Sequence, residues 1–381
     1  MKQVGIKMIN WNVGGAKYLE LPAWDGKGRR PTDWAPGDEI EYREQYKYAL
    51  MKALQNLISR HHPDVITLQE IVQYSASGNP SMREDLMDPV GGYTYVPFPL
   101  IDTEQYSAQP KWLKVMDKGG WTSPPRPFFA QGNGFLLKDM CPHYPVWSLT
   151  RADADHLMYP GNTGRDGQHK TRVERVDLQT GLYFGDRNTE PRVALVLHLV
   201  LPANGRPLDV FVVNLHLTTL RGEREGIPEI DEKASCDRLE QLKVVLDGVV
   251  SRYNQWRGNG YKIADRQVHV DPHWDIGAAQ ERHNPIWVIA GDFNFTRQSA
   301  EYQYLTRRNF MDLLPDDKPT KSSGLGKDPT LAVDYIFAGP RFYSFDPVLA
   351  EIGIKKNDVI VDDYVRVSDH YPVVANVPIV I

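Results

Sequence analysis

I-W-V-I-A-G-D-F-N-F, residues 286–295, joins an apolar run to a polar turn. The run 286–290 contains β-branched and aromatic residues and no polar one, which predicts a strand buried on both faces. Beyond Gly291, Asp292 and Asn294 lie two residues apart and therefore point the same way from an extended chain. The carboxylate can accept a proton or bind a hard cation, and the amide can donate to an anionic oxygen. The same residues are also typical of an Asx turn that closes a strand, so the interpretation depends on what recurs elsewhere.

Composition sets broad limits on the class of protein. A chain of 381 residues can hold two or three domains, or one α/β domain with insertions. The formal net charge is −5 and no Lys/Arg block occurs, which argues against nonspecific coating of DNA but leaves a local basic surface open. Cys141 and Cys236 are too few for a disulfide framework or a zinc site. With no signal peptide or membrane-spanning run evident, the sequence predicts a soluble cytoplasmic protein without a transmembrane segment. It does not predict the oligomeric state.

Two N-terminal strands are predicted to end in polar residues. Residues 4–12 form the first, and Asn12 closes it beside a Gly-Gly turn. Residues 65–68 form the second, and Glu70 follows at its C-terminal end. Burying an unpaired carboxylate is costly. Glu70 is therefore either at the rim of a sheet or a ligand of Mg²⁺ or Mn²⁺, which prefer carboxylate oxygen.

The second half of the chain repeats this pattern. Two apolar strands from residue 193 onward are joined by P-A-N-G-R-P, which predicts a hairpin whose second strand ends with Asn214 and His216 on one face. The strand L-A-V-D-Y-I-F places Asp334 among apolar residues. In V-R-V-S-D-H-Y-P-V-V, Asp369 and His370 separate two strand-like halves. Adjacent charged residues at a strand break indicate a site rather than a core.

Helices and loops complete the expected order of elements. Apolar residues at three- and four-residue spacing predict one helix through 46–58 and another through 239–253, and a short helix is expected to begin near Ser299. The remaining long stretches are predicted to be loop insertions, with a short strand possible at 93–96. They cover about residues 14–41, 71–128, 139–190 and 254–284.

The polar interruptions taken together resemble a known family. In chain order they read N-W-N, Q-E, G-N-G-F-L-L, N-L-H-L, G-D-F-N, V-D-Y-I-F and S-D-H-Y-P-V. This ordered set resembles the endonuclease/exonuclease/phosphatase superfamily, whose fold is that of pancreatic deoxyribonuclease. The resemblance covers residues 4–377, apart from the four insertions. It implies an α/β fold, a four-layered sandwich of two packed mixed β-sheets flanked by helices. Because Asn12 and His370 must meet in one site, it also implies a single catalytic domain over residues 1–381.

The resemblance implies a role for each motif residue. Asp292 is expected to orient or deprotonate the attacking water, His370 to contact the phosphate, and Asp334 to orient that histidine. The implied cofactor is Mg²⁺, or alternatively Mn²⁺, with three ligands: Asn12, Glu70 and Asp369. The predicted substrate-binding residues are Asn12, Asn214 and Asn294. The predicted catalytic residues are His216, Asp292, Asn294, Asp334 and His370.

Two positions depart from the family pattern. Many members specialised for abasic DNA carry an acid at the place of Gly14, which argues against an abasic-site enzyme. In some deoxyribonuclease-like members a glutamate pairs with the second histidine, and Gln131 stands nearest to that place here. His216 is therefore either a neutral hydrogen-bond donor or a general acid.

Three functional classes are consistent with these residues. The favoured one is a metal-dependent phosphodiesterase, or nuclease, that cleaves nucleic acid. The second is a phosphoesterase acting on a phospholipid headgroup or a small phosphorylated molecule. The third, a catalytically silent scaffold, is disfavoured because each motif position is occupied. In the first two classes the partner is a phosphate-ester substrate.

Overall fold

A computed structural model gives the structure of the protein for part of the chain. The described residues are 3–14, 38–75, 93–99, 128–138, 173–178, 192–203, 206–218, 228–250, 286–316, 318–323, 328–339, 351–352, 359–362, 364–365 and 367–380. Within these ranges, no helix has both the length and the apolar character needed to cross a membrane.

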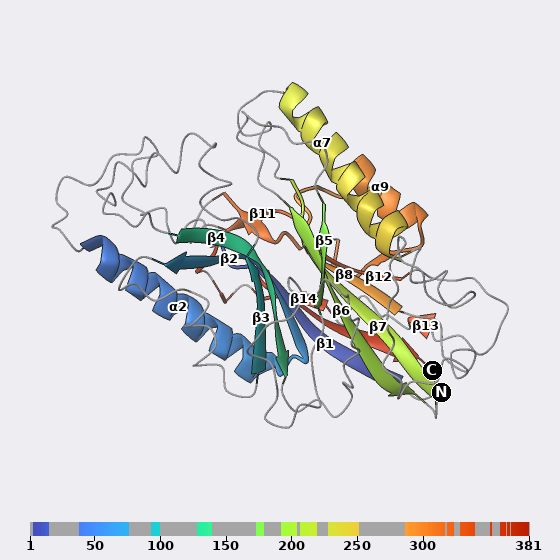
Figure 1. Ribbon diagram of the computed structural model, residues 1–381, viewed down its shortest axis with the longest axis horizontal. Coiled ribbons are helices and arrows are strands. Elements are labelled where there is room, and N and C mark those ends of the chain that lie inside the picture. Colours follow the sequence, from blue (N-terminus) through green and yellow to red (C-terminus); the bar gives the residue numbers. More distant parts are fainter. Residues whose placement is uncertain are drawn as a thin grey trace.

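Two mixed β-sheets lie face to face at the centre of the molecule (Figure 1). The first sheet has the order β13-β15-β1-β2-β4-β3, with β14 also paired to β15. Its strands are β1 (Gln3–Asn12), β2 (Val65–Ser75), β3 (Tyr93–Pro99), β4 (Phe128–Lys138), β13 (Glu351–Ile352), β14 (Val359–Val361) and β15 (Val373–Val380). The second sheet has the order β5-β6-β7-β8-β12-β9. Its strands are β5 (Val173–Asp177), β6 (Val193–Ala203), β7 (Arg206–His216), β8 (Ile286–Asp292), β9 (Met311–Asp312) and β12 (Asp334–Gly339).

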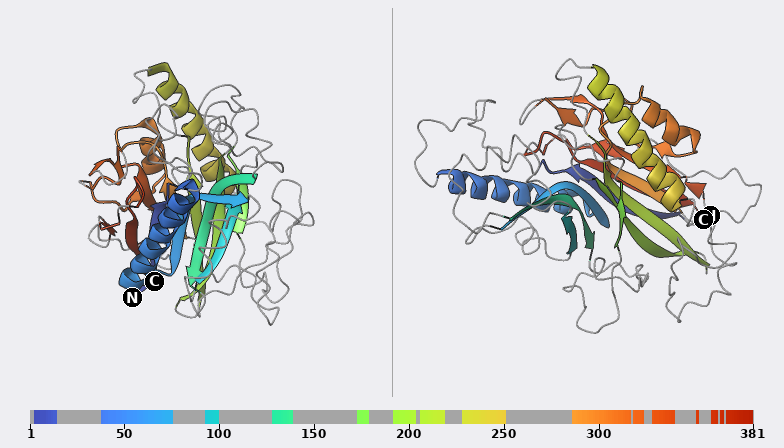
Figure 2. Two further views of the ribbon diagram at one scale, coloured as in Figure 1. Left: turned by 90° about the vertical axis from the view of Figure 1, so that its left-hand side faces the viewer. Right: turned by 45° about the horizontal axis from the view of Figure 1, so that its top comes forward.

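Helices lie on the outer sides of the two sheets (Figures 1 and 2). Helix α2 (Asp38–His61) runs beside β2 and β4 and buries Leu50, Leu54 and Leu57. Helix α7 (Pro228–Lys243), its π-helical continuation η2 (Val244–Val250) and α9 (Ala300–Arg307) lie on the opposite side. Ser299 caps α9 by accepting a hydrogen bond from the Tyr302 amide, so the expected helix start is confirmed. The predicted four-layered α/β sandwich is therefore confirmed.

The direction of the strands gathers their polar ends at one edge. Strands β1 and β2 run parallel, as do β7 and β8, so each pair has its carboxyl ends together. Strand β12 is antiparallel to β8, with Asp334 opposite Asp292, and β15 begins opposite the end of β1. Residues at the ends of some strands therefore meet residues at the beginnings of others.

Gly291 brings two of these strand ends close together. It lies opposite Leu215 in the parallel β7–β8 ladder, and a Cβ added to it would lie 2.0 Å from the Leu215 carbonyl oxygen. A side chain cannot fit there, so glycine is required by close backbone approach rather than only by a turn. The next residue pair in the register is His216 and Asp292.

Some ranges predicted to be loops contain regular structure. Helix α2 begins at Asp38, β2 continues to Ser75, and β5 lies inside the range 139–190. The short strand considered at 93–96 is present as β3, which continues to Pro99. Strand β5 reads V-E-R-V-D and, among the described strands, lies at the edge of its sheet beside β6, so it has little apolar pattern to detect. The prediction that β2 ends before Glu70 is also wrong, because the strand continues through a bulge. The other parts of the four predicted insertions lie outside the described residues.

Candidate active site

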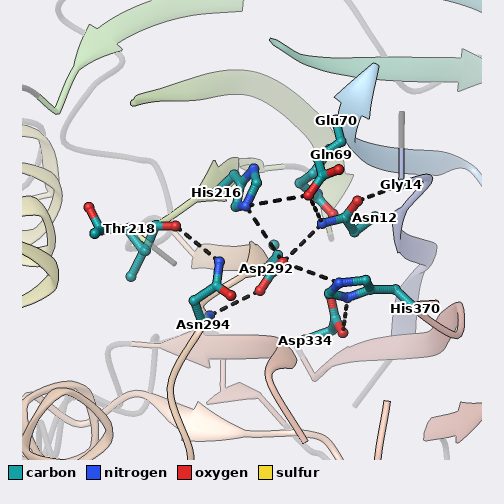
Figure 3. A network of polar contacts seen from close by, with 12 residues as sticks. Asn12, Gly14, Gln69, Glu70, His216, Thr218, Asp292, Asn294, Asp334 and His370 are labelled. Carbon is teal, nitrogen blue, oxygen red and sulfur yellow. Dashed lines mark hydrogen bonds and ion pairs between the residues drawn. The ribbon is translucent and has the colours of Figure 1, made fainter. Parts of the chain in front are cut away.

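Asn12, at the end of β1, connects carboxylates from both sheets (Figure 3). Its Nδ2 donates to Glu70 Oε1 at 3.0 Å and to Asp292 Oδ2 at 2.9 Å. Its Oδ1 accepts from the Gly14 amide at 2.9 Å, which fixes which way the side-chain amide faces. Asn12 therefore orients two acids that lie 222 positions apart (292 minus 70) in the sequence.

A β-bulge presents Glu70. The β2–β4 register breaks between Leu68 and Ile71, and Glu70 has a left-handed backbone with φ of 55°. A non-glycine residue in this conformation costs roughly 1–3 kcal/mol and occurs often at functional sites. The bulge turns the Glu70 side chain out of the ladder, where 18% of it remains exposed. Burial nevertheless raises its pKa, against the lowering effect of His370.

Asp292 and Asn294 form an Asx turn that also belongs to the site. Asp292 is buried, and its Oδ1 accepts from the Asn294 amide at 3.0 Å. Asn294 has φ of 51°, and its Nδ2 donates to the Leu217 carbonyl at 3.0 Å. Burial raises the pKa of Asp292, with His370 acting in the opposite direction. The Asx turn expected for G-D-F-N is therefore present, and it fixes the carboxylate that faces Asn12. The catalytic role of the two residues stays a prediction.

His370 and Asp334 form a buried pair. His370 Nδ1 lies 2.8 Å from Asp334 Oδ2, which also accepts from the Thr320 hydroxyl at 2.7 Å. Burial raises the pKa of Asp334 to about 8 and lowers the pKa of His370. At neutral pH the pair therefore carries one more proton than an ionised Asp334 and a neutral His370 would carry together. Whichever group holds that proton, His370 Nε2 carries a hydrogen, and it lies 3.6 Å from Asp292 Oδ2.

His216 has a cationic partner rather than an acidic one at its Nδ1. Arg192 Nη1 donates to His216 Nδ1 at 2.8 Å, because a guanidinium has no acceptor. The His216 hydrogen is therefore on Nε2, 3.6 Å from Asp292 Oδ2 and 3.9 Å from Glu70 Oε1. Burial, reinforced by Arg192, lowers the pKa of His216 well below its usual value. Of the two roles considered, this favours a neutral hydrogen-bond donor. The side chain of Gln131 lies outside the described residues.

Asn214 lies in a buried polar network between the sheets. Its Nδ2 donates to the carbonyls of Leu68 and Gly134, at 3.0 and 2.8 Å, and its Oδ1 accepts from Gln69 Nε2 at 2.7 Å. Gln69 also donates to Asn10 Oδ1 at 2.9 Å. Both amide hydrogens of Asn214 are thus used to satisfy backbone at the bulge. We therefore assign it to support of the Glu70 strand, whereas substrate contact by Asn12 and Asn294 stays a prediction.

The acids and histidines of the site are suited to a divalent cation. Ligand atoms of Glu70, His216 and Asp292 all lie within 4.8 Å of one another, as do those of Asp292, Asp334 and His370. The two clusters share Asp292, and we call their five residues the acid–histidine cluster. Burial raises the pKa of its carboxylates because it disfavours their charged forms, and a bound cation would stabilise those forms. Carboxylate oxygens suit Mg²⁺ or Mn²⁺.

Asp369 and Asn12 are the other two predicted ligands. Asp369 is buried and belongs to neither group, although its charge contributes to the raised pKa of Glu70, after burial. Asn12 donates through its nitrogen to Glu70 and Asp292. Their direct coordination of a metal stays a prediction.

Three residues near the site were not predicted from the sequence. Arg192 precedes a buried strand, Thr320 accompanies Asp334, and Lys321 pairs with His370 across a β-bridge. The last two lie in T-K-S-S-G, which has the composition of an ordinary turn. A charged residue at a strand start, as at Arg192, is also common on surfaces. The sequence carries no signal that distinguishes these residues from their neighbours.

Comparison with known proteins identifies the group to which the chain is similar. The profile of the Endonuclease/Exonuclease/phosphatase family matches residues 9–370. No curated protein matches the chain in sequence. Similar solved structures include an endonuclease/exonuclease/phosphatase from Beutenbergia cavernae, with 18% identity, TM-score 0.49, and coverage of 99% of this chain and 72% of that chain. Another is D. rerio TDP2 complexed with single-strand DNA product, with 13% identity, TM-score 0.46 and coverage of 98% of each chain. A third is a Bacteroides thetaiotaomicron mannosyl-6-phosphatase, with 13% identity, TM-score 0.46, and coverage of 98% of this chain and 99% of that chain. These likenesses are too distant to carry an argument about substrate.

Proposed function

The chain belongs to the endonuclease/exonuclease/phosphatase family, whose members are phosphoester hydrolases, and we propose that it is a phosphoesterase that requires Mg²⁺ or Mn²⁺. The observation that carries the proposal is the convergence of Glu70 and Asp292 on the Asn12 amide, with His370 beside Asp292. A divalent cation held by Glu70, with Asp369 close by, would act as a Lewis acid on a phosphate oxygen.

Asp292 is the residue that we assign to the attacking water. Hydrogen bonds from Asn12 and from the Asn294 amide fix its two oxygens, so the carboxylate is held in one orientation. Its raised pKa, caused first by burial, makes it a stronger base than an exposed aspartate. A carboxylate of this kind accepts a proton from water as the oxygen attacks phosphorus.

The two histidines are assigned to the phosphate oxygens. His370 Nε2 and His216 Nε2 each lie 3.6 Å from Asp292 Oδ2. A phosphate attacked by a water that Asp292 holds would therefore lie within reach of both N–H groups. Donors aimed at oxygens that gain charge stabilise the transition state more than the ground state. Asp334 holds the His370 ring by Nδ1, and Arg192 holds the His216 ring in the same way.

We place nucleic acid first among substrates, as a phosphodiesterase or nuclease. The support is His216, which matches the second histidine of the deoxyribonuclease-like branch of the family. A small phosphorylated molecule or a phospholipid headgroup is the second candidate. It is favoured by the formal net charge of −5, because an acidic protein repels an extended polyanion more than a small one.

A substrate panel tests the proposal. The purified protein would be assayed with single- and double-stranded DNA, RNA, a phosphatidylinositol phosphate, sphingomyelin and a chromogenic phosphodiester, with Mg²⁺, Mn²⁺ or EDTA. We expect metal-dependent cleavage of nucleic acid, which EDTA abolishes. The His370→Ala variant, prepared in parallel, should show no such cleavage. Turnover of the lipid or small substrates alone would select the second candidate. A protein inactive on the whole panel with both metals would contradict the proposed function.

A further inference from the structure

A short hairpin holds Lys321 against the acid–histidine cluster. Strand β10 (Lys321–Ser322) pairs with β11 (Pro329–Leu331). Thr320 and the two residues of β10 each pair with a residue of the site. The Thr320 hydroxyl donates to Asp334, and the Ser322 amide donates to the Asp369 carbonyl at 2.8 Å. Lys321 itself is paired with His370 in an antiparallel bridge. The hairpin is thus fixed to the two segments that carry Asp334 and His370.

The geometry of this bridge determines where Lys321 points. The Tyr371 amide donates to the Thr320 carbonyl and the Ser322 amide to the Asp369 carbonyl, so Lys321 and His370 form a non-hydrogen-bonded antiparallel pair. In such pairs the Cα atoms are about 4.5 Å apart and both side chains leave on the same face of the ladder. The Lys321 side chain therefore starts on the face that carries the His370 imidazole.

The charge of Lys321 acts on the whole cluster. After burial, which is the largest effect at each group, Lys321 lowers the pKa of Glu70, Asp292 and Asp334 and of both histidines. Lys321 is only half-buried, whereas Arg192 is buried behind His216. Within the described part of the chain, Lys321 forms no ion pair with a carboxylate. Its ammonium group is thus close to the cluster and not committed to one acid.

An anionic substrate requires such a group. Glu70, Asp292 and Asp369 together repel a phosphate, and one divalent cation offsets only part of their charge. We propose that Lys321 binds a non-bridging phosphate oxygen of the substrate and so positions the phosphate beside His370. This inference rests on the proposed function, since it assigns a specific phosphate contact within the same site. Lysine donors are common phosphate ligands, and a flexible stem lets the ammonium follow the oxygen during reaction.

The alternative role is structural, because a half-buried lysine could only screen the neighbouring carboxylates. The two roles differ in what they predict for ligand binding. A screening lysine stabilises the fold and leaves phosphate affinity unchanged, whereas a phosphate ligand changes affinity directly. The test must therefore measure binding and stability separately.

Calorimetric titration of the Mg²⁺-loaded protein with inorganic phosphate provides this test without requiring turnover. Lys321→Met removes the charge and keeps much of the side-chain volume, and Lys321→Arg keeps the charge. Lys318→Met is the matched control, since Lys318 is exposed three residues earlier on the same segment. We expect Lys321→Met to weaken phosphate binding by roughly 10- to 100-fold, as for loss of a charge-assisted hydrogen bond. Lys321→Arg should bind within about fivefold of the parent, and Lys318→Met like the parent.

Each outcome decides the assignment. Weakened binding in Lys321→Met alone, with an unchanged unfolding midpoint, supports it, and the difference should shrink as salt is added. Parent-like affinity in Lys321→Met overturns it, including the case in which only stability falls. A parent protein that binds no phosphate also overturns it. The proposed function is judged independently by turnover on the substrate panel, so an active enzyme with an unaffected Lys321→Met variant would refute this inference alone.

Discussion

The two histidines of the site have opposite partners on their Nδ1 atoms. His370 contacts the Asp334 carboxylate, and His216 accepts from the Arg192 guanidinium. A carboxylate favours a protonated ring, whereas a guanidinium excludes one. The same residue type is thus set for two roles, His370 able to carry positive charge and His216 held neutral.

This difference predicts which histidine substitution lowers turnover more. His370→Ala should reduce turnover more than His216→Ala, because a ring that can become cationic stabilises more charge on the phosphate. Groups of this kind contribute about 10²- to 10⁴-fold, and we expect His370 near the upper end and His216 near the lower. Turnover at saturating substrate, with circular dichroism to check folding, measures both. A larger loss at His216 would mean that the central role belongs to the other histidine.

Asp334 should act through His370 rather than independently. Asp334→Asn is expected to lower turnover as His370→Ala does, but by less, because the amide still holds the ring but supplies no charge. Combining Asp334→Asn with His370→Ala should cost little more than His370→Ala alone, since residues that act as a unit are not additive. The double-mutant cycle is measured from turnover of the four proteins. Additive losses would show that Asp334 acts separately.

The Asp334–His370 pair also predicts a pH dependence of stability. In the folded protein the pair keeps its extra proton up to about pH 8. In the unfolded chain the aspartate loses its proton near pH 3.8 and the histidine near pH 6.5. A pKa raised on folding stabilises the fold below that value, and the stability is lost as pH rises through it. In metal-free protein, the free energy of unfolding should therefore fall between pH 7 and about 8, by up to about 1.4 kcal/mol per unit. Denaturant unfolding measures the slope, and an equal slope in Asp334→Asn would contradict this account.

At this scale the sequence predicted the residues better than their conformations. Asp292, Asp334 and His370 were expected to serve one site, and the structure brings them together. The left-handed backbone at Glu70 could not be anticipated, because Q-E-I has the composition of an ordinary strand end. Partners such as Arg192 were missed for a similar reason, since a single arginine follows no periodic pattern.

Among the elements, the bulge in β2 does most to shape the site. The register between β2 and β4 breaks after Leu68, and Asn214 from the opposite sheet donates to the Leu68 carbonyl. Strand pairs and helices with clear periodicity were predicted closely, including the β6–β7 hairpin and the start of α9. The bulge was not predicted from the sequence, because a bulge changes the pairing of a strand without changing its hydrophobic pattern.

The network around the bulge predicts a structural effect of Asn214. Asn214→Ala leaves the buried carbonyls of Leu68 and Gly134 without their donor, at about 1–3 kcal/mol each. The free energy of unfolding should therefore fall by roughly 2–6 kcal/mol. Denaturant unfolding is the measurement, with Asn294→Ala as the comparison. If Asn214→Ala kept parental stability and only raised KM, Asn214 would be a substrate ligand instead.

At the scale of the molecule, the sandwich assembles one site from both ends of the chain. The Trp11 indole donates to the His370 carbonyl at 3.1 Å across 359 positions of sequence. The first sheet supplies Glu70 and the second supplies Asp292, and Asn12 contacts both. The order of the motifs was enough to predict this architecture. The edge strands β5, β9 and β13 were not predicted, because their sequences carry little periodicity.

We propose that this assembled site hydrolyses phosphoesters with a divalent cation held by Glu70. The most direct measurement is Mg²⁺-dependent turnover of the best panel substrate by the parent and by Glu70→Gln, with Mg²⁺ affinity measured by calorimetry. Glu70→Gln keeps the shape of the side chain and removes its charge, so we expect the fold to persist while Mg²⁺ affinity and turnover each fall by at least about tenfold. Hydrolysis by Glu70→Gln at the parental rate, with the same Mg²⁺ dependence, would contradict the account.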